Sequence, residues 1–333
     1  DHGMVERARV TEDYAEQAVM EAPPPVDMPV PEPMPIGHAT EPRRTPGPLT
    51  EAPVRLDAIP NEPPAPLLID RLEPKGHTIL FGPGGIGKGS LTSWWTVELT
   101  REGHTVLIVD YERHPDEWRR RVGSLDPEAL TSVYHVTPTG ALWQSTDRLR
   151  DMVQATEASV FIIDSIVIAC AGRDVVDPGT AALYAQAVAA LGVPVLSLGH
   201  NTKLGDTRYP FGSVFWHNLA RFTWSLTMEA TGLVLACRKS NNYAKPAKRD
   251  VRLDWYEGTL GDVRETSHSE ALADMALEVL TREPMSLAQI VDRLNDDRDE
   301  DLPPLKKNSV HQALKRARKL GGCGYRGNGY VST

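Results

Sequence analysis

The sequence contains few cysteines and no long apolar run. Cys170, Cys237 and Cys323 are far apart in a chain of 333 residues, and their spacing fits neither a metal site nor a redox motif. We therefore expect reduced, packed thiols. No apolar stretch approaches the about 20 residues that a membrane-spanning helix needs, and the N-terminus lacks the basic and apolar regions of a secretory signal. These absences predict a soluble, cytoplasmic protein that does not act at a membrane.

Basic residues are also in the minority, with 36 Lys and Arg against 45 Asp and Glu. The resulting formal net charge of −9 would normally argue against nucleic-acid binding. However, residues 305–333 contain seven basic residues and no acidic one, namely Lys306, Lys307, Lys315, Arg316, Arg318, Lys319 and Arg326. The charge is therefore segregated, and the sequence predicts a basic face at the C-terminus.

The sequence predicts three regions. Residues 1–66 hold 15 of the 27 prolines and have little apolar patterning, which indicates a flexible, partly polyproline-II arm. From residue 67 short apolar runs alternate with helical stretches up to about residue 265, as in a mainly parallel α/β sheet. The remaining residues, 268–333, form a third region.

The elements of the α/β region can be placed from these patterns. Buried strands are expected at 77–81, 105–110, 159–164 and 193–200, and helices at 90–102 and 178–191. Three later segments with short turns between them are typical of antiparallel strands that complete the sheet, at 221–229, 232–240 and 249–258.

The C-terminal region resembles a winged helix-turn-helix in its order of elements. Helices are expected at 270–281, 286–295 and 307–320, followed by a Gly-rich hairpin. In the last helix the apolar residues share one face and leave a basic outer face. We expect DNA contacts from Lys307, Lys315, Arg316, Lys319 and Arg326. A solvated helix or a protein-binding surface are the alternatives.

The stretch "GPGGIGKGS" resembles a phosphate-binding loop between an apolar strand and a helix. Glycines allow backbone N–H groups to surround phosphate oxygens, and Lys88 would reach the β and γ phosphates of ATP. Gly89 stands where a Ser or Thr usually binds magnesium, so we expect a more aqueous shell for Mg²⁺. The predicted nucleotide-binding residues are Gly82, Pro83, Gly84, Gly85, Ile86, Gly87, Lys88, Gly89 and Ser90.

Two strand ends supply carboxylates. Asp164 ends the apolar stretch "VFIID", the form of a Walker B site that holds Mg²⁺ directly or through water. Glu112 follows "LIVDY" and could orient and deprotonate the water that attacks the γ phosphate. A surface ion pair between Glu112 and Arg113 or Arg119 is the alternative.

Five stretches in this order resemble the RecA-like ATPase family that contains plasmid RepA helicase and many phage ATPases: "LFGPGGIGKGSLTSWW", "VLIVDYERHPDEWRRRV", "VFIIDSIVIACAG", "VPVLSLGHNTK" and "PFGSVFWHNLARFTWSL". The similarity covers about residues 68–263. It implies that Lys88 and Asp164 bind ATP and Mg²⁺, that Glu112 is the catalytic base, and that His200 is a polar sensor.

The resemblance also implies a ring of identical subunits, with a hexamer favoured. A basic residue of one subunit then completes the ATP site of the next, and Arg238 and Lys239 match that region best, with Arg221 as a runner-up. Lys203 and Arg208 lie where relatives present a DNA-contacting loop.

We therefore predict an ATP-hydrolysing, RecA-like, DNA-binding protein of phage or plasmid replication or recombination, with possible helicase activity. Two rival functions stay open at this stage. One is a nucleotide kinase, because lysine-glycine-serine resembles the lysine-glycine-threonine of adenylate kinases. The other is a non-catalytic DNA-binding regulator that uses ATP to control its assembly.

Overall fold

The structure of the protein is a computed structural model that describes residues 54–201, 209–212, 214–229, 231–296, 303–327 and 329–332. Its contacts divide the chain into two units, Asp1–Asn61 and Glu62–Thr333. The described part of the first unit contains a 3-10 helix, η1 (Leu56–Ala58). Most of the predicted N-terminal arm lies outside the described residues, and the predicted domain boundaries at 66 and 265–268 stay predictions.

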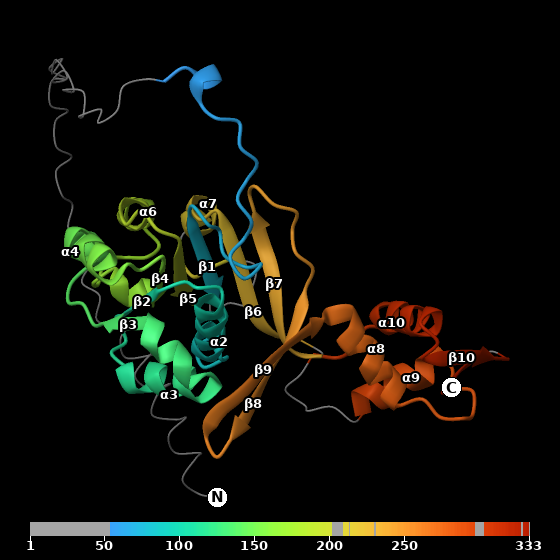
Figure 1. Ribbon diagram of the computed structural model, residues 1–333. Helices are drawn as coiled ribbons and strands as arrows, with labels where there is room; N and C mark the ends of the chain where they lie inside the picture. Colours follow the sequence, from blue (N-terminus) through green and yellow to red (C-terminus); the bar gives the residue numbers. More distant parts are fainter. Residues whose placement is uncertain are drawn as a thin grey trace, which may run out of the picture. The chain divides into compact units, whose positions relative to one another are not determined.

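The second unit contains a nine-stranded sheet with the order β3-β2-β4-β5-β1-β6-β7-β8-β9 (Figure 1). Neighbouring strands from β3 to β6 all pair in parallel. The remaining pairs, from β6 to β9, are antiparallel. The strands are β1 (His77–Phe81), β2 (Val106–Asp110), β3 (Val133–Val136), β4 (Val160–Asp164), β5 (Val195–Gly199), β6 (Phe222–Glu229), β7 (Gly232–Ser240), β8 (Arg249–Tyr256) and β9 (Thr259–Ser267).

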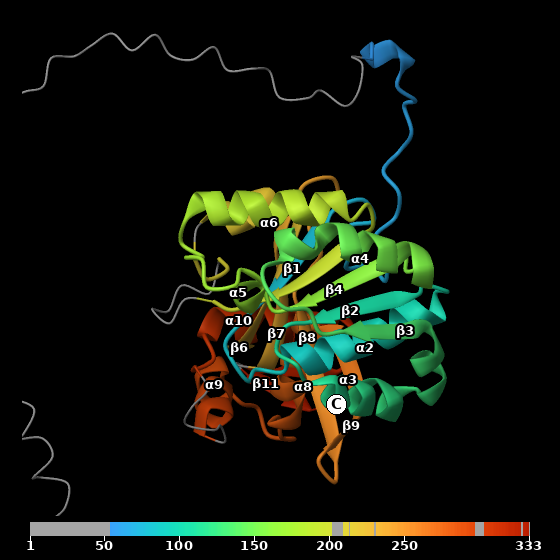
Figure 2. The same cartoon turned by 90° about the vertical axis from the view of Figure 1, so that its left-hand side faces the viewer.

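Helices cover both faces of the sheet, which explains why its central strands are continuous apolar runs. Figure 2 shows α4 and α6 over one face and α2 and α3 over the other. The two faces carry separate apolar clusters, one around Phe161 and Tyr184 and one around Trp95 and Trp224. The helices are α2 (Lys88–Arg101), α3 (Pro115–Leu125), α4 (Leu142–Thr156), α5 (Ile166–Ala169), α6 (Pro178–Ala190) and α7 (Val214–Leu219), with the 3-10 helix η2 (Pro127–Ser132) after α3.

The predicted α/β class and the mainly parallel sheet are confirmed. Strand β6 differs from the expectation, because it pairs in parallel with β1 on one side and antiparallel with β7 on the other. Strands β3 and β9 and helices α3 and α4 had no prediction. Their hydrophobic signal is weak, since β3 is only partly buried and α3 buries only Trp118 and Val122.

A buried ion pair joins the beginning of this unit to its last sheet strand. Arg71 donates two hydrogen bonds to Glu265, from Nε to Oε1 at 3.1 Å and from Nη2 to Oε2 at 2.6 Å. The indole N–H of Trp224 donates to the carbonyl of Arg71 at 2.9 Å, and the Arg71 guanidinium lies 5.0 Å from the Trp94 ring centroid. The segment before β1 is thus anchored across the sheet.

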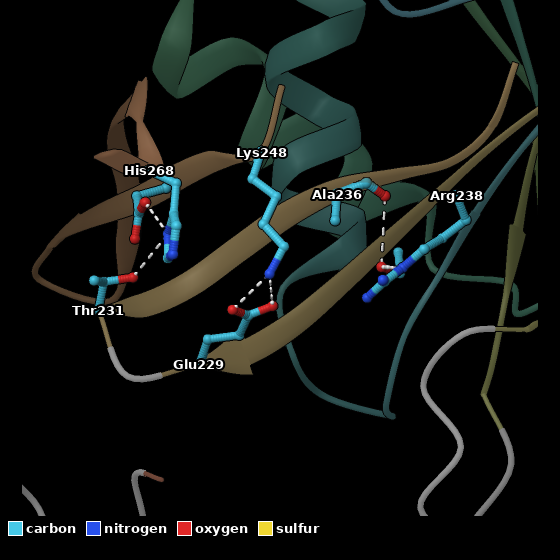
Figure 3. Close-up of polar contacts among 8 residues, drawn as sticks. Glu229, Thr231, Ala236, Arg238, Lys248 and His268 are labelled. Carbon is cyan, nitrogen blue, oxygen red and sulfur yellow. Dashed lines mark hydrogen bonds and ion pairs between the residues drawn. The ribbon is translucent and has the colours of Figure 1, made fainter. Parts of the chain in front are cut away.

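The C-terminal part contains α8 (His268–Glu278), α9 (Leu287–Asp296), α10 (Lys307–Lys319) and the antiparallel hairpin of β10 (Cys323–Arg326) and β11 (Gly329–Ser332). These elements share an apolar cluster of their own, centred on Leu272, Ile290 and Leu314. At the start of α8, His268 lies 2.7 Å from Asp250 and 3.3 Å from Thr231 (Figure 3). Within the described part of the chain, every helix is too short or too polar to cross a bilayer.

Candidate nucleotide-binding site

Several phosphate-loop glycines are required by their backbone angles or by neighbouring atoms. Between β1 and α2 the chain turns through Gly85 and Gly87, whose φ angles of +74° and +99° are rarely adopted by other residues. A side chain at Gly87 would also come within 2.7 Å of Leu253, and one at Gly82 would collide with the carbonyl of Leu226. The loop therefore closes tightly over β6 and β8, and α2 begins directly after it.

Lys88 closes the loop from within. Its Nζ donates to the carbonyl oxygens of Gly82 at 3.0 Å and Pro83 at 2.7 Å. Burial lowers the pKa of Lys88, while the nearby carboxylates of Asp164 and Glu112 act in the opposite direction. The ammonium is thus positioned at the centre of the loop, where the expected phosphates would lie.

The carboxyl ends of four parallel strands meet around the loop. Glu112 follows β2, Asp164 ends β4 and His200 follows β5, while the loop itself follows β1. All three side chains line one cavity of about 340 Å³, together with Lys88 and Ser90. The structure thus brings together the predicted loop lysine, both carboxylates and the histidine at one edge of the sheet.

Asp110 holds the turn that carries Glu112. Its buried carboxylate accepts hydrogen bonds from the backbone N–H groups of Glu112 and Arg113, both at 2.9 Å, and of His114, at 2.6 Å. The ring of His135 lies 3.1 Å from the same carboxylate. Asp110 therefore positions Glu112, and Glu112 lines the cavity. The spacing of these two residues in the sequence does not reveal which of them has which role.

Asp164 lies in a strongly perturbed environment. Burial, followed by the negative charges of Glu112 and Asp110, raises its pKa to about 7, against the opposing effect of Lys88 and Arg121. A cation beside this carboxylate would stabilise its charged form and so lower its pKa.

Ser165, the next residue, supplies a second observation that suits a hydrated metal ion. It lines the same cavity, and its buried Oγ has no hydrogen-bond partner among the described residues. A carboxylate and an unsatisfied hydroxyl fit Mg²⁺, which prefers oxygen ligands and keeps several waters.

The surroundings of His200 favour the uncharged form of its ring. Burial and the positive charge of Lys88 lower its pKa, and Glu112 only partly offsets them. A neutral imidazole can both donate and accept a hydrogen bond, as a residue that reports the state of a phosphate must.

Arg121, like Ser165, is a cavity residue that the sequence prediction missed. Arg121 of α3 lines the cavity and is paired with Glu117 at 2.6 Å. A Cβ added at Gly89 would lie 2.8 Å from Nη1 of Arg121. The space that an ordinary Ser or Thr would use therefore borders a guanidinium, whereas the sequence suggested only water there. Three consecutive arginines after Trp118 were the available signal, but sequence alone does not tell which of them points inward.

The two candidate trans-acting residues have different surroundings. Nε of Arg238 donates to Ser225 at 2.7 Å near the end of β7 (Figure 3). Nζ of Lys239 donates to the carbonyls of His217, Asn218 and Ala220 at 3.0, 2.7 and 2.6 Å, so it caps the end of α7. Neither lines the nucleotide cavity of its own chain. Lys203 and Arg208, the predicted DNA-contacting loop residues, lie outside the described residues.

The predicted DNA contacts of the C-terminal part fall on more than one surface. Lys307, Lys315, Lys319 and Arg326 are exposed. Arg316 is exposed as well, but it is directed toward α8, where it contacts Ser269 and pairs with Glu270 at 3.1 Å. The basic residues of α10 are therefore divided between two faces of the helix.

These features define the class of protein. In the sheet, β5 separates β1, the strand before the phosphate loop, from β4, the strand that ends in Asp164, and Glu112 follows the next strand, β2. This strand order is that of a RecA-like P-loop ATPase domain. Residues 42–206, just under half of the chain, match the family model described as an AAA domain.

Comparison with solved structures gave matches that include a KaiC-like protein from the hyperthermophilic archaeon Pyrococcus horikoshii OT3. The sequence identity is 14% and the TM-score is 0.49, and the match covers 60% of this chain and 93% of that one. The fold assignment above rests on the strand order and the phosphate loop. Comparison with curated proteins found no match.

Proposed function

We propose that this protein hydrolyses ATP in a reaction that depends on Mg²⁺ and is coupled to DNA. The observation that carries the proposal is the convergence of Lys88, Glu112, Asp164 and His200 in one cavity at the carboxyl edge of the sheet. Each comes from the end of a different parallel strand or the loop after it, the usual location of ligand sites in open α/β sheets.

Each residue has a definite task in this reaction. Lys88 binds the β and γ phosphates from within the loop, and Glu112 accepts a proton from the attacking water. His200 contacts the γ phosphate through its neutral ring, and Arg121 adds positive charge beside Gly89. Asp164 and Ser165 would hold Mg²⁺, which neutralises charge on the phosphates when it is bound.

The DNA-binding part of the proposal rests on charge. Exposed cations of α10 and β10 occupy a stretch of 29 residues, 305–333, that contains no acidic residue. A helix and hairpin of this charge are suited to phosphate contacts, as in a winged helix. The proposed assembly is a ring of subunits in which Arg238, which does not line the cavity of its own chain, reaches the ATP site of the neighbour. The proposed biological setting is replication or recombination.

Steady-state ATP turnover, with and without single-stranded DNA, tests the proposal. We expect Lys88→Ala to abolish turnover and weaken ATP binding, because the central ammonium is lost. Glu112→Gln is expected to bind ATP but turn over at least about 100-fold more slowly, the usual contribution of general base catalysis. Glu98→Gln on the surface of α2 is the matched control and should behave as wild type.

The same assay separates the rivals. ATP binding without turnover, with or without DNA, would support a regulator that uses ATP only for assembly. Transfer of phosphate to a nucleoside monophosphate would support a kinase. Wild-type turnover in Glu112→Gln would show that Glu112 is not the catalytic base.

A further inference from the structure

A surface between α10 and the β10–β11 hairpin combines cations with aromatic rings. It forms an open cavity of about 470 Å³ lined by His311, Lys315, Arg318, Lys319, Tyr325 and Tyr330, the basic–aromatic pocket. Its volume falls within the range of about 300–1,000 Å³ found for small-molecule sites. Residues 311, 315, 318 and 319 follow helical spacing and so share one face of α10.

The Tyr325 ring is exposed but held in place. Its side chain is 47% exposed, yet Arg318 lies over the ring with Cζ 5.4 Å from the centroid. The buried Tyr330 meets it edge to face, at 5.0 Å between centroids and 79° between planes. The hydroxyl of Tyr330 is in turn 3.3 Å from Nδ1 of His311. A fixed aromatic surface binds a planar ligand with little ordering cost.

The positive charge of this pocket is not balanced by acidic residues of its own segment, because residues 305–333 contain none. Glu270 of α8 pairs with Arg316, a residue outside the pocket. Lys315, Arg318 and Lys319 therefore suit an anionic ligand, and the Tyr325 ring suits a flat one. A phosphate with an attached base has both properties.

We propose that the basic–aromatic pocket binds an unpaired base of single-stranded DNA by stacking on Tyr325, with the adjacent phosphates on Lys315 and Lys319. In a duplex the faces of the bases are covered by their neighbours, so an aromatic ring is complementary only to an unstacked base. This inference rests on the proposed DNA-binding function. It specifies that the C-terminal elements recognise an unstacked base as well as the phosphates.

The test is fluorescence anisotropy of the full-length protein with three labelled DNAs of equal length: oligothymidine, the corresponding abasic strand, and a mixed-sequence duplex. We expect the wild type to prefer oligothymidine over the abasic strand, which has the same phosphates but no bases. Tyr325→Ala should weaken oligothymidine binding about 5- to 150-fold, as expected for one lost stacking contact, and should abolish the preference.

Matched variants separate stacking from charge and from folding. Tyr325→Phe keeps the ring and should keep the preference, whereas Lys315→Ala should weaken both single strands by the same factor. Arg252→Ala, at an exposed position of β8 outside the C-terminal elements, should leave the preference unchanged. Thermal unfolding of each variant identifies any loss of fold.

Three results would overturn the inference: equal binding of oligothymidine and the abasic strand by the wild type, a preference that survives in Tyr325→Ala, or tight duplex binding that depends on Tyr325. ATP turnover is measured on the same preparations. A protein that hydrolyses ATP and binds DNA without base dependence would contradict this inference alone, whereas a protein without turnover or DNA binding would contradict the proposed function.

Discussion

At the scale of residues, Arg238 and Lys239 are neighbours with different surroundings. The Lys239 ammonium satisfies three carbonyls at the end of α7, and burial lowers its pKa. Among the described residues the Arg238 side chain donates to Ser225 through Nε, which leaves the other N–H groups of its guanidinium to act elsewhere. The structure thus favours Arg238 for the role in trans and a structural role for Lys239.

We expect Arg238→Ala to fold normally and to lose at least about 100-fold in ATP turnover, because arginines that act in trans contribute about 10³–10⁵-fold in related chemistry. Lys239→Ala should instead lower the free energy of unfolding by about 1 kcal/mol, because the partly buried and exposed carbonyls at the end of α7 lose their donor. Turnover and urea unfolding are measured for both variants.

Mixed oligomers show whether Arg238 acts across an interface. A mixture of Arg238→Ala and Glu112→Gln subunits contains interfaces in which one subunit supplies Glu112 and the other supplies Arg238. Such a mixture should regain activity that neither variant has alone. Absence of any recovery in oligomers proven to be mixed would place Arg238 outside the neighbour's site.

At the scale of elements, the packing of α3 beside the start of α2 determines what occupies the space at Gly89. Arg121 lies there because Gly89 has no side chain, and the two residues form a matched pair. A serine at position 89 would place its Cβ 2.8 Å from Nη1 of Arg121, which is too close for both groups, so the end of the arginine side chain must shift.

We expect Gly89→Ser and Arg121→Ala to reduce ATP affinity and turnover by similar factors, because both remove the guanidinium from the cavity. The double variant should lose no more than either single one, since neighbouring changes that act through the same contact are not additive. It should also need less Mg²⁺ than Arg121→Ala, because its hydroxyl can act as a ligand. ATP and Mg²⁺ titrations of turnover measure these effects, and additive losses would contradict the coupling.

The sequence predicted those elements that a pattern within a short segment identifies, such as an apolar run or a set of glycines. Strands β1, β2, β4 and β5 are short apolar runs, and their predicted bounds were correct to within two residues at each end. The glycine pattern also located the loop between β1 and α2, whereas phosphate binding by this loop stays a prediction. Helix α3 buries few apolar residues, so its position against α2 and the inward direction of Arg121 depend on contacts from other elements. The role of Asp110 likewise depends on three backbone N–H groups that a sequence does not place in space.

At the scale of the whole molecule, a buried polar network joins two strands of the sheet to α6. His77 of β1 is 2.8 Å from the hydroxyl of Ser197 on β5, and Tyr184 of α6 is 2.9 Å from the same hydroxyl. Burial lowers the pKa of His77 from 6.5 to about 3. The folded protein therefore keeps this imidazole neutral at pH values where the unfolded chain binds a proton.

The network predicts a pH dependence of stability. The folded-state pKa of His77 lies below the unfolded value. The contribution of neutral His77 to the free energy of unfolding is therefore fully present above about pH 6.5 and is lost as the pH falls toward 3. Below about pH 6 this free energy should fall by about 1.4 kcal/mol per pH unit. Urea unfolding at about pH 7 and about pH 5 measures it, and His77→Gln, which can still bond to Ser197, should show a smaller difference. An equal difference in both proteins would assign the effect to other groups.

The ion pair between Arg71 and Glu265 has a consequence for the protein during its synthesis. Its partners are 194 positions apart, and the later one lies in β9, the edge strand of the sheet. During translation the chain therefore exposes the segment around Arg71 and the flank of β8 until residue 265 has left the ribosome. Folding of this unit must end late, and a truncated chain that stops before β9 would carry an unpaired buried arginine and an open sheet edge, which are signals for aggregation or proteolysis.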